Sequence, residues 1–330
     1  MGDSCGAAIP DTVSDWLVRR SSRSSHWSAR QLVGHKGMRR VSVVIPARNE
    51  EATIGPIVHV VRECLVDEVP LVDELLVVDS RSTDRTADLA AAAGARVVPQ
   101  DSVLAHLPLA TGKGEALWKG LAASSGDFVV YVDGDLRDFS PQFIVGLLGP
   151  LLLDDGVCYV KGFYHRPLEN GTAVEPDGGG RVTELVARPL LNLYWPELSG
   201  FVQPLAGEYA GRRDVLERIP YATDYGVEVG HLIDLLDLCG LDALAQVDLG
   251  TRKHRHQGNH GLGQMAGQIM LTVLNRLEHA GRMTGGAPAS TTLAQFRRDS
   301  SARPLEFDLL LTDLAAVERP PLATLGVRRP

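Results

Sequence analysis

The sequence has few cysteines, few aromatic residues and no long apolar run. Its four cysteines, Cys5, Cys64, Cys158 and Cys239, are widely spaced, which excludes a disulfide-rich secreted framework and CxxC zinc sites. We interpret them as free thiols of a protein in the reducing cytoplasm. No segment reaches the roughly 20 apolar residues of a membrane span, and the first 30 residues lack the basic-then-apolar order of a secretory signal.

The sequence also lacks an excess of basic residues. Its 33 lysine and arginine residues stand against 41 aspartate and glutamate residues, which gives a net charge of −8. Proteins that bind nucleic acid generally carry a basic face, so this balance argues against such a partner. A site for an anionic small molecule would have to be a small basic pocket in an otherwise acidic protein. With 44% apolar and 22% charged residues, the composition is that of an ordinary globular protein.

From Val41 onward, short β-branched runs alternate with helix-like segments. The runs "VSVVIPA", "DELLVVD", "RVVPQ" and "DFVVYVD" predict strands, and the segments between them have the spacing and caps of helices. Strands and helices that alternate over about a hundred residues predict right-handed crossovers and a mostly parallel sheet with both faces covered. The predicted fold class is therefore α/β, with a Rossmann-like sheet flanked by helices and a less regular mixed α/β second half.

Polar residues follow three of these strands, at 46–50, at 79–80 and at 133–135. Ligands of open parallel sheets bind beyond the carboxyl ends of the strands. Asp133 and Asp135, one glycine apart, offer oxygen ligands for a hard cation such as Mg²⁺ or Mn²⁺, and a diphosphate would complete its shell. Taken singly, each group has a plainer interpretation, as turn aspartates, helix caps or first-turn charges. Their agreement predicts a crevice for a nucleotide.

The second half adds a glycine-rich turn and a basic loop. In "GGGRVTE", the N–H groups at the start of a helix, with Arg181 and Thr183, could receive a phosphate; the plainer interpretation is a loop with a capped helix. The loop "RKHRHQGNH" offers imidazoles among cations. As a metal ligand, His254 needs a carboxylate pair nearby, and Arg252 or Arg255 could instead neutralise a diphosphate.

Together these segments resemble a known family. The segments "VSVVIPARNEEATI", "VDELLVVDSRSTDRT", "GKGEALWKGL" and "VVYVDGDL" resemble the nucleotide-sugar domain of GT-A-fold glycosyltransferases. The later segments "GGGRVTELVARPLL", "QPLAGEYAGRR", "YGVEVGHLIDL" and "VDLGTRKHRH" are more specific. They resemble the actinobacterial glucosyl-3-phosphoglycerate synthases and the related mannosyl-3-phosphoglycerate synthases. The resemblance covers roughly residues 40–280.

The resemblance implies an activity and its partners. It implies a GT-A-type fold and a retaining hexosyltransferase that moves glucose from UDP-glucose to the 2-hydroxyl of 3-phosphoglycerate. The product would be glucosyl-3-phosphoglycerate, a precursor of glucosylglycerate and of methylglucose lipopolysaccharide. The resemblance also implies a divalent cation, Mg²⁺ or Mn²⁺, and a homodimer.

The resemblance further implies the roles of individual residues. The nucleotide and its cofactor site would involve Pro46, Ala47, Arg48, Glu50, Ser80, Lys113 and Asp133. The metal would be held by Asp135 and His254. The acceptor and the sugar would contact Gly180, Arg181, Thr183, Leu205, Tyr225 and Arg252. The catalytic residues would be Glu228, Asp135 and Lys113, with Glu228 orienting sugar hydroxyls or stabilising positive charge rather than acting as a covalent nucleophile.

The sequence pattern divides the chain into four parts, with a soft boundary near residue 150. These are an N-terminal arm at 1–40, a nucleotide-sugar-binding domain at 41–150, an acceptor-binding and catalytic subdomain at 151–281, and a C-terminal tail at 282–330. We interpret the basic, serine-rich stretch of the arm as a solvated leader, and the proline- and arginine-rich tail gives little structural signal.

Three alternatives stay open at this point. Arg48 stands where many glucosyl relatives have leucine, and His256 follows His254 where another polar residue occurs, so GDP-mannose competes with UDP-glucose as the donor. A sugar-phosphate nucleotidyltransferase would also join an α/β sheet to Mg²⁺, but "PARNEE" is not a glycine-rich triphosphate loop. A non-enzymatic sugar-nucleotide-binding protein would need neither the aspartate pair nor the phosphate-accepting turn.

Overall fold

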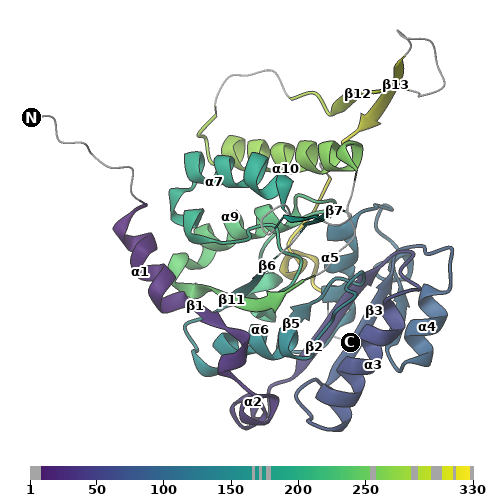
Figure 1. Ribbon diagram of the computed structural model, residues 1–330, viewed down its shortest axis with the longest axis vertical. Helices are drawn as coiled ribbons and strands as arrows, with labels where there is room; N and C mark the ends of the chain where they lie inside the picture. Colours follow the sequence, from purple (N-terminus) through teal and green to yellow (C-terminus); the bar gives the residue numbers. More distant parts are fainter. Residues whose placement is uncertain are drawn as a thin grey trace, which may run out of the picture.

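The computed structural model describes residues 9–165, 168–170, 173–175, 180–252, 258–283, 289–298, 307–314 and 317–327 (Figure 1). The strands of its main sheet are β1 (Ser21–Arg23), β2 (Val41–Ala47), β3 (Glu74–Asp79), β4 (Arg96–Pro99), β5 (Phe128–Tyr131), β6 (Tyr159–His165), β9 (Tyr209–Arg212) and β11 (Leu244–Thr251). The helices are α1 (Asp11–Arg20), α2 (Ala29–Lys36), α3 (Ile54–Arg62), α4 (Thr86–Ala92), α5 (Lys113–Ala123), α6 (Gln142–Leu153), α7 (Arg188–Tyr194), α8 (Arg213–Leu216), α9 (Val227–Cys239) and α10 (Asn259–His279).

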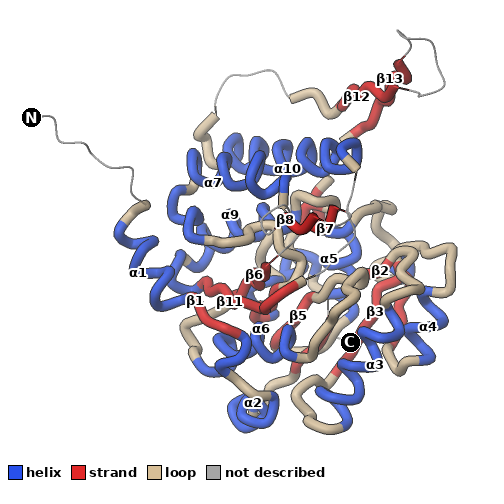
Figure 2. Tube along the Cα trace, viewed as in Figure 1, coloured by secondary structure: helices blue, strands red, loops and turns tan. Residues whose placement is uncertain are grey.

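The main sheet is mostly parallel. Within the described residues it has eight strands in the order β1-β11-β6-β9-β5-β2-β3-β4, with helices on both faces (Figure 2). The exception is β9, which pairs antiparallel with both β5 and β6. This arrangement confirms the predicted fold class, and the carboxyl ends of β2, β3, β4 and β5 meet at one edge of the sheet.

Two apolar cores lie on opposite faces of the sheet, because successive side chains of a strand point to opposite sides. In β2, Val43 and Ile45 join a core that contains residues of α3 and α6, whereas Val44 joins a core with residues of α5 and α9. All three valine and isoleucine side chains are fully buried. This two-sided burial explains why the strands read as nearly continuous apolar runs.

The N-terminal segment is part of the folded body from Asp11 onward. Val13 and Trp16 of α1 are fully buried, and the indole Nε1 of Trp16 donates a hydrogen bond of 2.8 Å to the carbonyl of Leu244. Strand β1 then extends the sheet by pairing parallel with β11. The stretch at 19–30, which we interpreted as a solvated leader, contains β1 and is therefore part of the sheet, so that interpretation needs correction there. Only Val13 and Trp16 of the ten residues of α1 are buried, a pattern too short to stand out in the sequence.

The C-terminal segment also forms defined structure. Strands β12 (Thr292–Arg298) and β13 (Phe307–Asp313) form an antiparallel hairpin that projects beyond α10 (Figure 1). Strand β14 (Glu318–Arg319) then returns to the body and pairs with β10 (Tyr221–Ala222). The remaining short pair consists of β7 (Leu168–Asn170) and β8 (Ala173–Glu175). Among the described helices, none has the length and apolar character needed to cross a membrane.

Candidate active site

A cavity of about 650 Å³ lies at the carboxyl ends of the parallel strands. It gathers every predicted site residue that falls within the described part of the chain: Pro46, Ala47, Arg48, Glu50, Ser80, Lys113, Asp133, Asp135, Gly180, Arg181, Thr183, Leu205, Tyr225, Glu228 and Arg252. The other predicted residue, His254, lies outside the described residues, as does Arg255. Residues from both halves of the sequence therefore share one cavity, while their individual roles stay predictions.

Lys113 connects two carboxylates at the centre of the cavity. Its Nζ lies 2.7 Å from Asp133 Oδ1 and 2.9 Å from Glu228 Oε1. Burial opposes the charged form of this lysine, but the two carboxylates outweigh it and hold the pKa of Lys113 well above its usual value. Lys113 is the first residue of α5. The preceding Gly112 has φ of +116°, and this backbone conformation allows the turn that directs the Lys113 side chain into the cavity.

Arg252 lies between the two aspartates that the sequence assigned to a cation. Its Nη2 is 3.1 Å from Asp133 Oδ2 and 3.0 Å from Asp135 Oδ1, and its Nη1 is 3.0 Å from Glu208 Oε2. Burial opposes ionisation of Asp133, but Lys113 and Arg252 hold its pKa well below the usual range. Asp133 is therefore a carboxylate at any physiological pH, already neutralised by two cations of the protein.

Two glycines make room around this carboxylate. A Cβ atom at Gly207 would lie 2.3 Å from an Asp133 oxygen and 2.5 Å from Lys113 Nζ, so no side chain fits there. A Cβ at Gly134, between the aspartates, would lie 3.0 Å from the Pro46 carbonyl. The glycine of "DGD" therefore allows the end of β2 to approach closely, in addition to lining the cavity.

Glu228 occupies the first turn of α9, and its side chain is only 4% exposed. Behind it lies a buried cluster that includes Lys161 and Tyr209, in which the Lys161 Nζ stands 4.7 Å from the centroid of the Tyr209 ring. Burial lowers the pKa of Lys161 to about 7, although the charge of Glu228 acts in the opposite direction. Glu228 thus faces Lys113 from a largely apolar and aromatic wall.

Another part of the cavity is lined by Gly180, Arg181 and Thr183, at the described end of the predicted glycine-rich turn. Gly180 has φ of +79°, and its carbonyl accepts a hydrogen bond of 3.0 Å from the backbone N–H of Glu184 as the chain becomes helical. Arg181 Nη1 donates to Asn259 Oδ1 at 3.0 Å, which joins this turn to the start of α10. Thr183 is buried beside it. The chain becomes helical directly after Gly180, while binding of a phosphate at this point stays a prediction.

The carboxylate oxygens of Asp133 and Asp135 are the ligand type that Mg²⁺ and Mn²⁺ prefer, so the residues present fit a hard cation. Within the described residues, no group of three or more histidine, cysteine, aspartate or glutamate side chains gathers as a complete metal site. Further ligands would come from the bound diphosphate or from the predicted His254, which falls in a segment that is not described.

Sequence reasoning missed several residues that line the cavity: Gln100, Gly112, Gly207 and Asp224. Gln100 follows the end of β4, so the rule that found Ser80 at the neighbouring strand end would have found it too. Asp224 precedes the predicted Tyr225, and burial raises its pKa to about 6. Gly207 carried no signal of its own, because only the pairing of β9 with β5 brings it beside Asp133.

Comparisons with known proteins agree with this geometry. The sequence model described as "Glycosyl transferase family 2" matches residues 42–216. A Mycolicibacterium smegmatis protein named glucosyl-3-phosphoglycerate synthase is 46% identical over 313 residues, which are 95% of this chain and 99% of that one. The chain belongs to the glucosyl-3-phosphoglycerate synthase family. The recognition made from the sequence motifs is confirmed.

Solved structures of this family and of a related one have the same fold. A mannosyl-3-phosphoglycerate synthase from Rubrobacter xylanophilus aligns with a TM-score of 0.87 at 40% identity and covers 96% of this chain and 100% of that one. A glucosyl-3-phosphoglycerate synthase from Mycobacterium tuberculosis, in complex with Mn²⁺, UDP-glucose and phosphoglyceric acid, aligns with a TM-score of 0.77 at 43% identity. It covers 91% of this chain and 95% of that one.

Proposed function

We propose that this enzyme transfers glucose from UDP-glucose to the 2-hydroxyl of 3-phosphoglycerate with retention of configuration, giving glucosyl-3-phosphoglycerate. The observation that carries the proposal is the single cavity that joins the Asp133–Asp135 pair and Lys113 to the Arg181–Thr183 turn. One end suits a metal-bound diphosphate and the other suits a phosphate. The M. tuberculosis relative has been crystallised with Mn²⁺, UDP-glucose and phosphoglyceric acid and with Mg²⁺ and UDP, which supports the same donor, acceptor and cofactor here.

The donor is proposed to lie across the first strand ends, in the part formed by residues 41–150. Pro46, Ala47, Arg48, Glu50 and Ser80 would contact the nucleoside. Arg48 is exposed, lines the cavity and makes no hydrogen bond or ion pair with any other described residue, so it is available to the nucleotide. A divalent cation held by Asp135, with His254 as the further predicted ligand, would stabilise the charge of the departing diphosphate.

Three charged side chains of the protein would bind and orient the donor and stabilise the charges that develop during transfer. Lys113 neutralises Asp133 and Glu228, so that the sugar and the diphosphate can be held beside both carboxylates. Arg252, fixed by Glu208, places positive charge beside the leaving group. Glu228 orients sugar hydroxyls and stabilises the positive charge that develops at the anomeric carbon.

The acceptor is proposed to bind in the part formed by residues 151–281. Gly180, Arg181 and Thr183 would hold the phosphate of 3-phosphoglycerate, and Leu205 and Tyr225 would contact the sugar. Retention by front-face transfer would require the acceptor hydroxyl to lie on the same face of the sugar as the leaving diphosphate. An oxygen of the donor phosphate would then accept the proton of the acceptor hydroxyl.

Initial-rate assays test the proposal directly. The protein is incubated with 3-phosphoglycerate and a panel of UDP- and GDP-sugars, with Mg²⁺ or with EDTA. We expect UDP release from UDP-glucose only when Mg²⁺ and 3-phosphoglycerate are both present. Release of pyrophosphate from a nucleoside triphosphate would identify a nucleotidyltransferase, and absence of any product would indicate a binding protein.

Mannosyl transfer from GDP-mannose is the second candidate. The observation in its favour is the TM-score of 0.87 to the R. xylanophilus mannosyl-3-phosphoglycerate synthase, together with Arg48 at the donor end. In the same assay, a higher kcat/KM with GDP-mannose than with UDP-glucose would assign this activity instead.

We also propose that the enzyme is a cytoplasmic homodimer. The free thiols of Cys64, Cys158 and Cys239 support a reducing compartment. The β12–β13 hairpin supports self-association, because Phe296, Leu309 and Leu311 form one exposed apolar face of it. The opposite face of the hairpin is anchored to α10, where Gln264 Nε2 donates to Thr312 Oγ1 at 3.0 Å.

A further inference from the structure

Ser80 and Gln100 lie side by side where two parallel strands end. Ser80 directly follows β3 and Gln100 directly follows β4, and both residues line the cavity. Gln100 is 2% exposed, while Ser80 is partly exposed. Both side chains are uncharged, unlike the Lys113–Asp133 centre of the cavity. This end of the cavity therefore suits the uncharged base of a nucleotide.

The amide of Gln100 has only one satisfactory orientation. Its Nε2 donates to the carbonyl of Ala110 at 3.1 Å, and its Oε1 accepts from Ser80 Oγ at 2.9 Å. A backbone carbonyl has no proton to give, so the NH₂ group must face Ala110. The reversed amide would place its oxygen against the Ala110 oxygen, where neither atom has a proton to give, and the Ala110 carbonyl would lose its hydrogen bond from Gln100.

The orientation of Gln100 in turn fixes the hydroxyl of Ser80. A serine hydroxyl carries a single proton, and here that proton is given to Gln100 Oε1. No donor among the described residues hydrogen-bonds to Ser80 Oγ, so its remaining lone pairs are available to the cavity. Ser80 is thus an acceptor, and not a donor, toward whatever lies against it.

We propose that Gln100 is a positioning residue that determines nucleobase specificity. By taking the Ser80 proton, it makes Ser80 an acceptor for a ring N–H of the donor's base, such as N3–H of uracil or N1–H of guanine. Cytosine presents an unprotonated N3 at the matching position, and two acceptors then face each other. This inference rests on the proposed function, because it requires a nucleotide in this end of the cavity.

Binding of UDP and CDP in the presence of Mg²⁺ tests the inference by titration calorimetry. We expect the wild-type protein to bind UDP at least about tenfold more tightly than CDP, the effect of one satisfied against one unsatisfied buried hydrogen bond. In Gln100→Met, which is similar in shape, Ser80 regains a mobile proton that it can donate to cytosine. The ratio of the two dissociation constants should then fall to within about threefold, mainly through tighter CDP binding.

Two further variants test whether the base preference depends on the hydrogen bonding of Gln100 and Ser80 or only on their packing. Gln100→Glu keeps an acceptor toward Ser80, so the preference for UDP should persist while both affinities fall. Ser80→Ala removes the acceptor, so UDP should bind more weakly and CDP should be little affected. Gln246→Met is the matched control, because Gln246 is a buried glutamine with hydrogen bonds to Ser21 and Gly200 outside the cavity. It should leave the ratio unchanged.

The outcomes distinguish this inference from the proposed function. A folded Gln100→Met protein that keeps the wild-type preference for UDP overturns the inference, as does a wild-type protein that binds UDP and CDP equally. Unchanged UDP affinity in Ser80→Ala also overturns it, even if Gln100→Met does not fold. A wild-type protein that turns over UDP-glucose leaves the proposed function intact in all these cases, whereas one that binds no nucleotide refutes both.

Discussion

At the scale of single residues, the site is a chain of alternating charges. Glu228, Lys113, Asp133, Arg252 and Asp135 follow one another through ion pairs of 2.7 to 3.1 Å. Such a chain stays charged in a partly buried site because each group has an opposite partner. A substrate that enters must exchange some of these pairs for its own charges, which makes each member sensitive to substitution.

Asp135→Ala should abolish turnover, because Asp135 is the proposed ligand of the divalent cation. We expect kcat/KM to fall at least about a hundredfold, since a metal ion that stabilises a leaving group is worth several kcal/mol. Asp138→Ala is the matched control, because Asp138 is exposed, lies three residues further on and does not line the cavity. Steady-state rates over a range of Mg²⁺ concentrations provide the measurement. Full activity in Asp135→Ala would refute the metal assignment.

Arg181→Ala should chiefly weaken binding of the acceptor. The loss of one charge-assisted contact to a phosphate corresponds to a rise in KM for 3-phosphoglycerate of about ten- to a hundredfold, with a smaller change in kcat. Arg188→Ala is the comparison, because Arg188 bonds to Glu184 and to the Val202 carbonyl and does not line the cavity. An unchanged KM in Arg181→Ala would place the phosphate elsewhere.

Lys161→Met should change how stability depends on pH. Burial lowers the pKa of Lys161 to about 7, so between pH 7 and its unfolded value near 10.4 the unfolded chain binds more protons than the folded one. This lysine therefore makes the wild-type protein more stable as pH rises through that window, by on the order of 1 kcal/mol per pH unit. The methionine variant lacks this pH-dependent contribution to the free energy of unfolding.

Urea unfolding at pH 6 and at pH 9 provides the measurement for Lys161→Met. The stability of the variant relative to the wild type should be greatest at pH 6 and should shrink toward pH 9. Parallel pH dependences in the two proteins would show that Lys161 is charged in the folded state throughout this range.

Several site residues could be predicted because they sit at strand ends that the sequence marks clearly. Asp133, Asp135 and Ser80 each follow a run of buried aliphatic residues, and the carboxyl ends of parallel strands meet at one edge. The position of Arg252 between the aspartates was not predictable. It depends on the place of β11 in the sheet, three strands away from β5, which no local pattern specifies.

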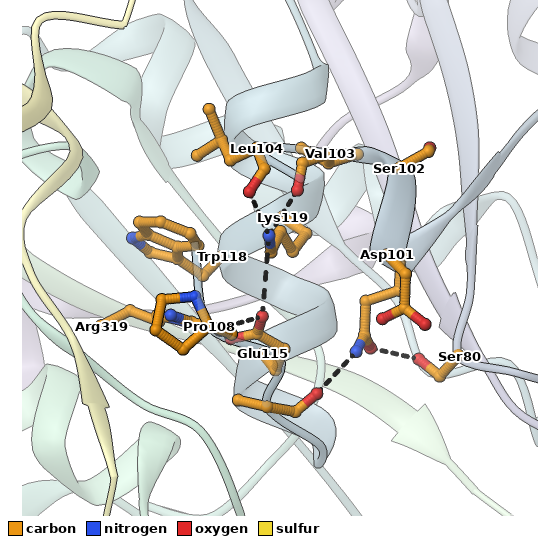
Figure 3. Close-up of polar contacts among 12 residues, drawn as sticks. Ser80, Asp101, Ser102, Val103, Leu104, Pro108, Glu115, Trp118, Lys119 and Arg319 are labelled. Carbon is orange, nitrogen blue, oxygen red and sulfur yellow. Dashed lines mark hydrogen bonds and ion pairs between the residues drawn. The ribbon is translucent and has the colours of Figure 1, made fainter. Parts of the chain in front are cut away.

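At the scale of elements, the C-terminal strand holds α5 in place. Arg319 of β14 forms a two-bond ion pair with the buried Glu115, at 2.6 and 2.8 Å, and Lys119 Nζ lies 3.8 Å from the same carboxylate (Figure 3). Lys119 also donates to the carbonyls of Val103 and Leu104. Because α5 begins at Lys113, this cluster supports the helix that carries Lys113.

Arg319→Met should destabilise the protein strongly, by about 3–5 kcal/mol, because it leaves a buried carboxylate without its main partner. The double variant Glu115→Leu/Arg319→Met should recover most of this loss, since both buried charges are then removed. Urea denaturation of the two single variants and the double variant gives the coupling energy. Additive effects would show that the pair makes no net interaction.

The elements were predicted well where their apolar periodicity is clear, as for β2, β3 and α3. They were missed where burial depends on one or two large side chains among polar ones. The helix α1 is anchored by Trp16, and β14 is anchored by Arg319. A sequence pattern predicts that an arginine lies at the surface, although Arg319 is buried. Only the tertiary partner, a carbonyl for one and Glu115 for the other, explains either burial.

At the scale of the whole molecule, the projecting hairpin predicts the oligomeric state. Leu311 is 65% exposed on the same face of the β12–β13 hairpin as Phe296, and Leu311→Asp should convert the proposed homodimer to a monomer. Val18→Asp, at an exposed apolar residue of α1, is the control and should leave the dimer intact. Leu193→Asp on α7 tests the helical surface as the alternative interface.

Analytical ultracentrifugation at several protein concentrations provides the measurement for these variants. A Leu311→Asp protein that remains dimeric, beside a monomeric Leu193→Asp protein, would move the interface from the hairpin to the helices. A wild-type protein that sediments as a monomer would refute the homodimer itself.

The place of β9 in the middle of the main sheet has a consequence for biosynthesis. Until residues 209–212 have left the ribosome, β5 has an open edge and β6 has no neighbour on that side. The centre of the sheet can therefore be completed only after nearly two thirds of the chain has been synthesised. A fragment that stops at residue 150 would leave the edge of β5 unpaired and prone to aggregation. Synthesis of this enzyme should accordingly depend on protection of that edge by chaperones until β9 arrives.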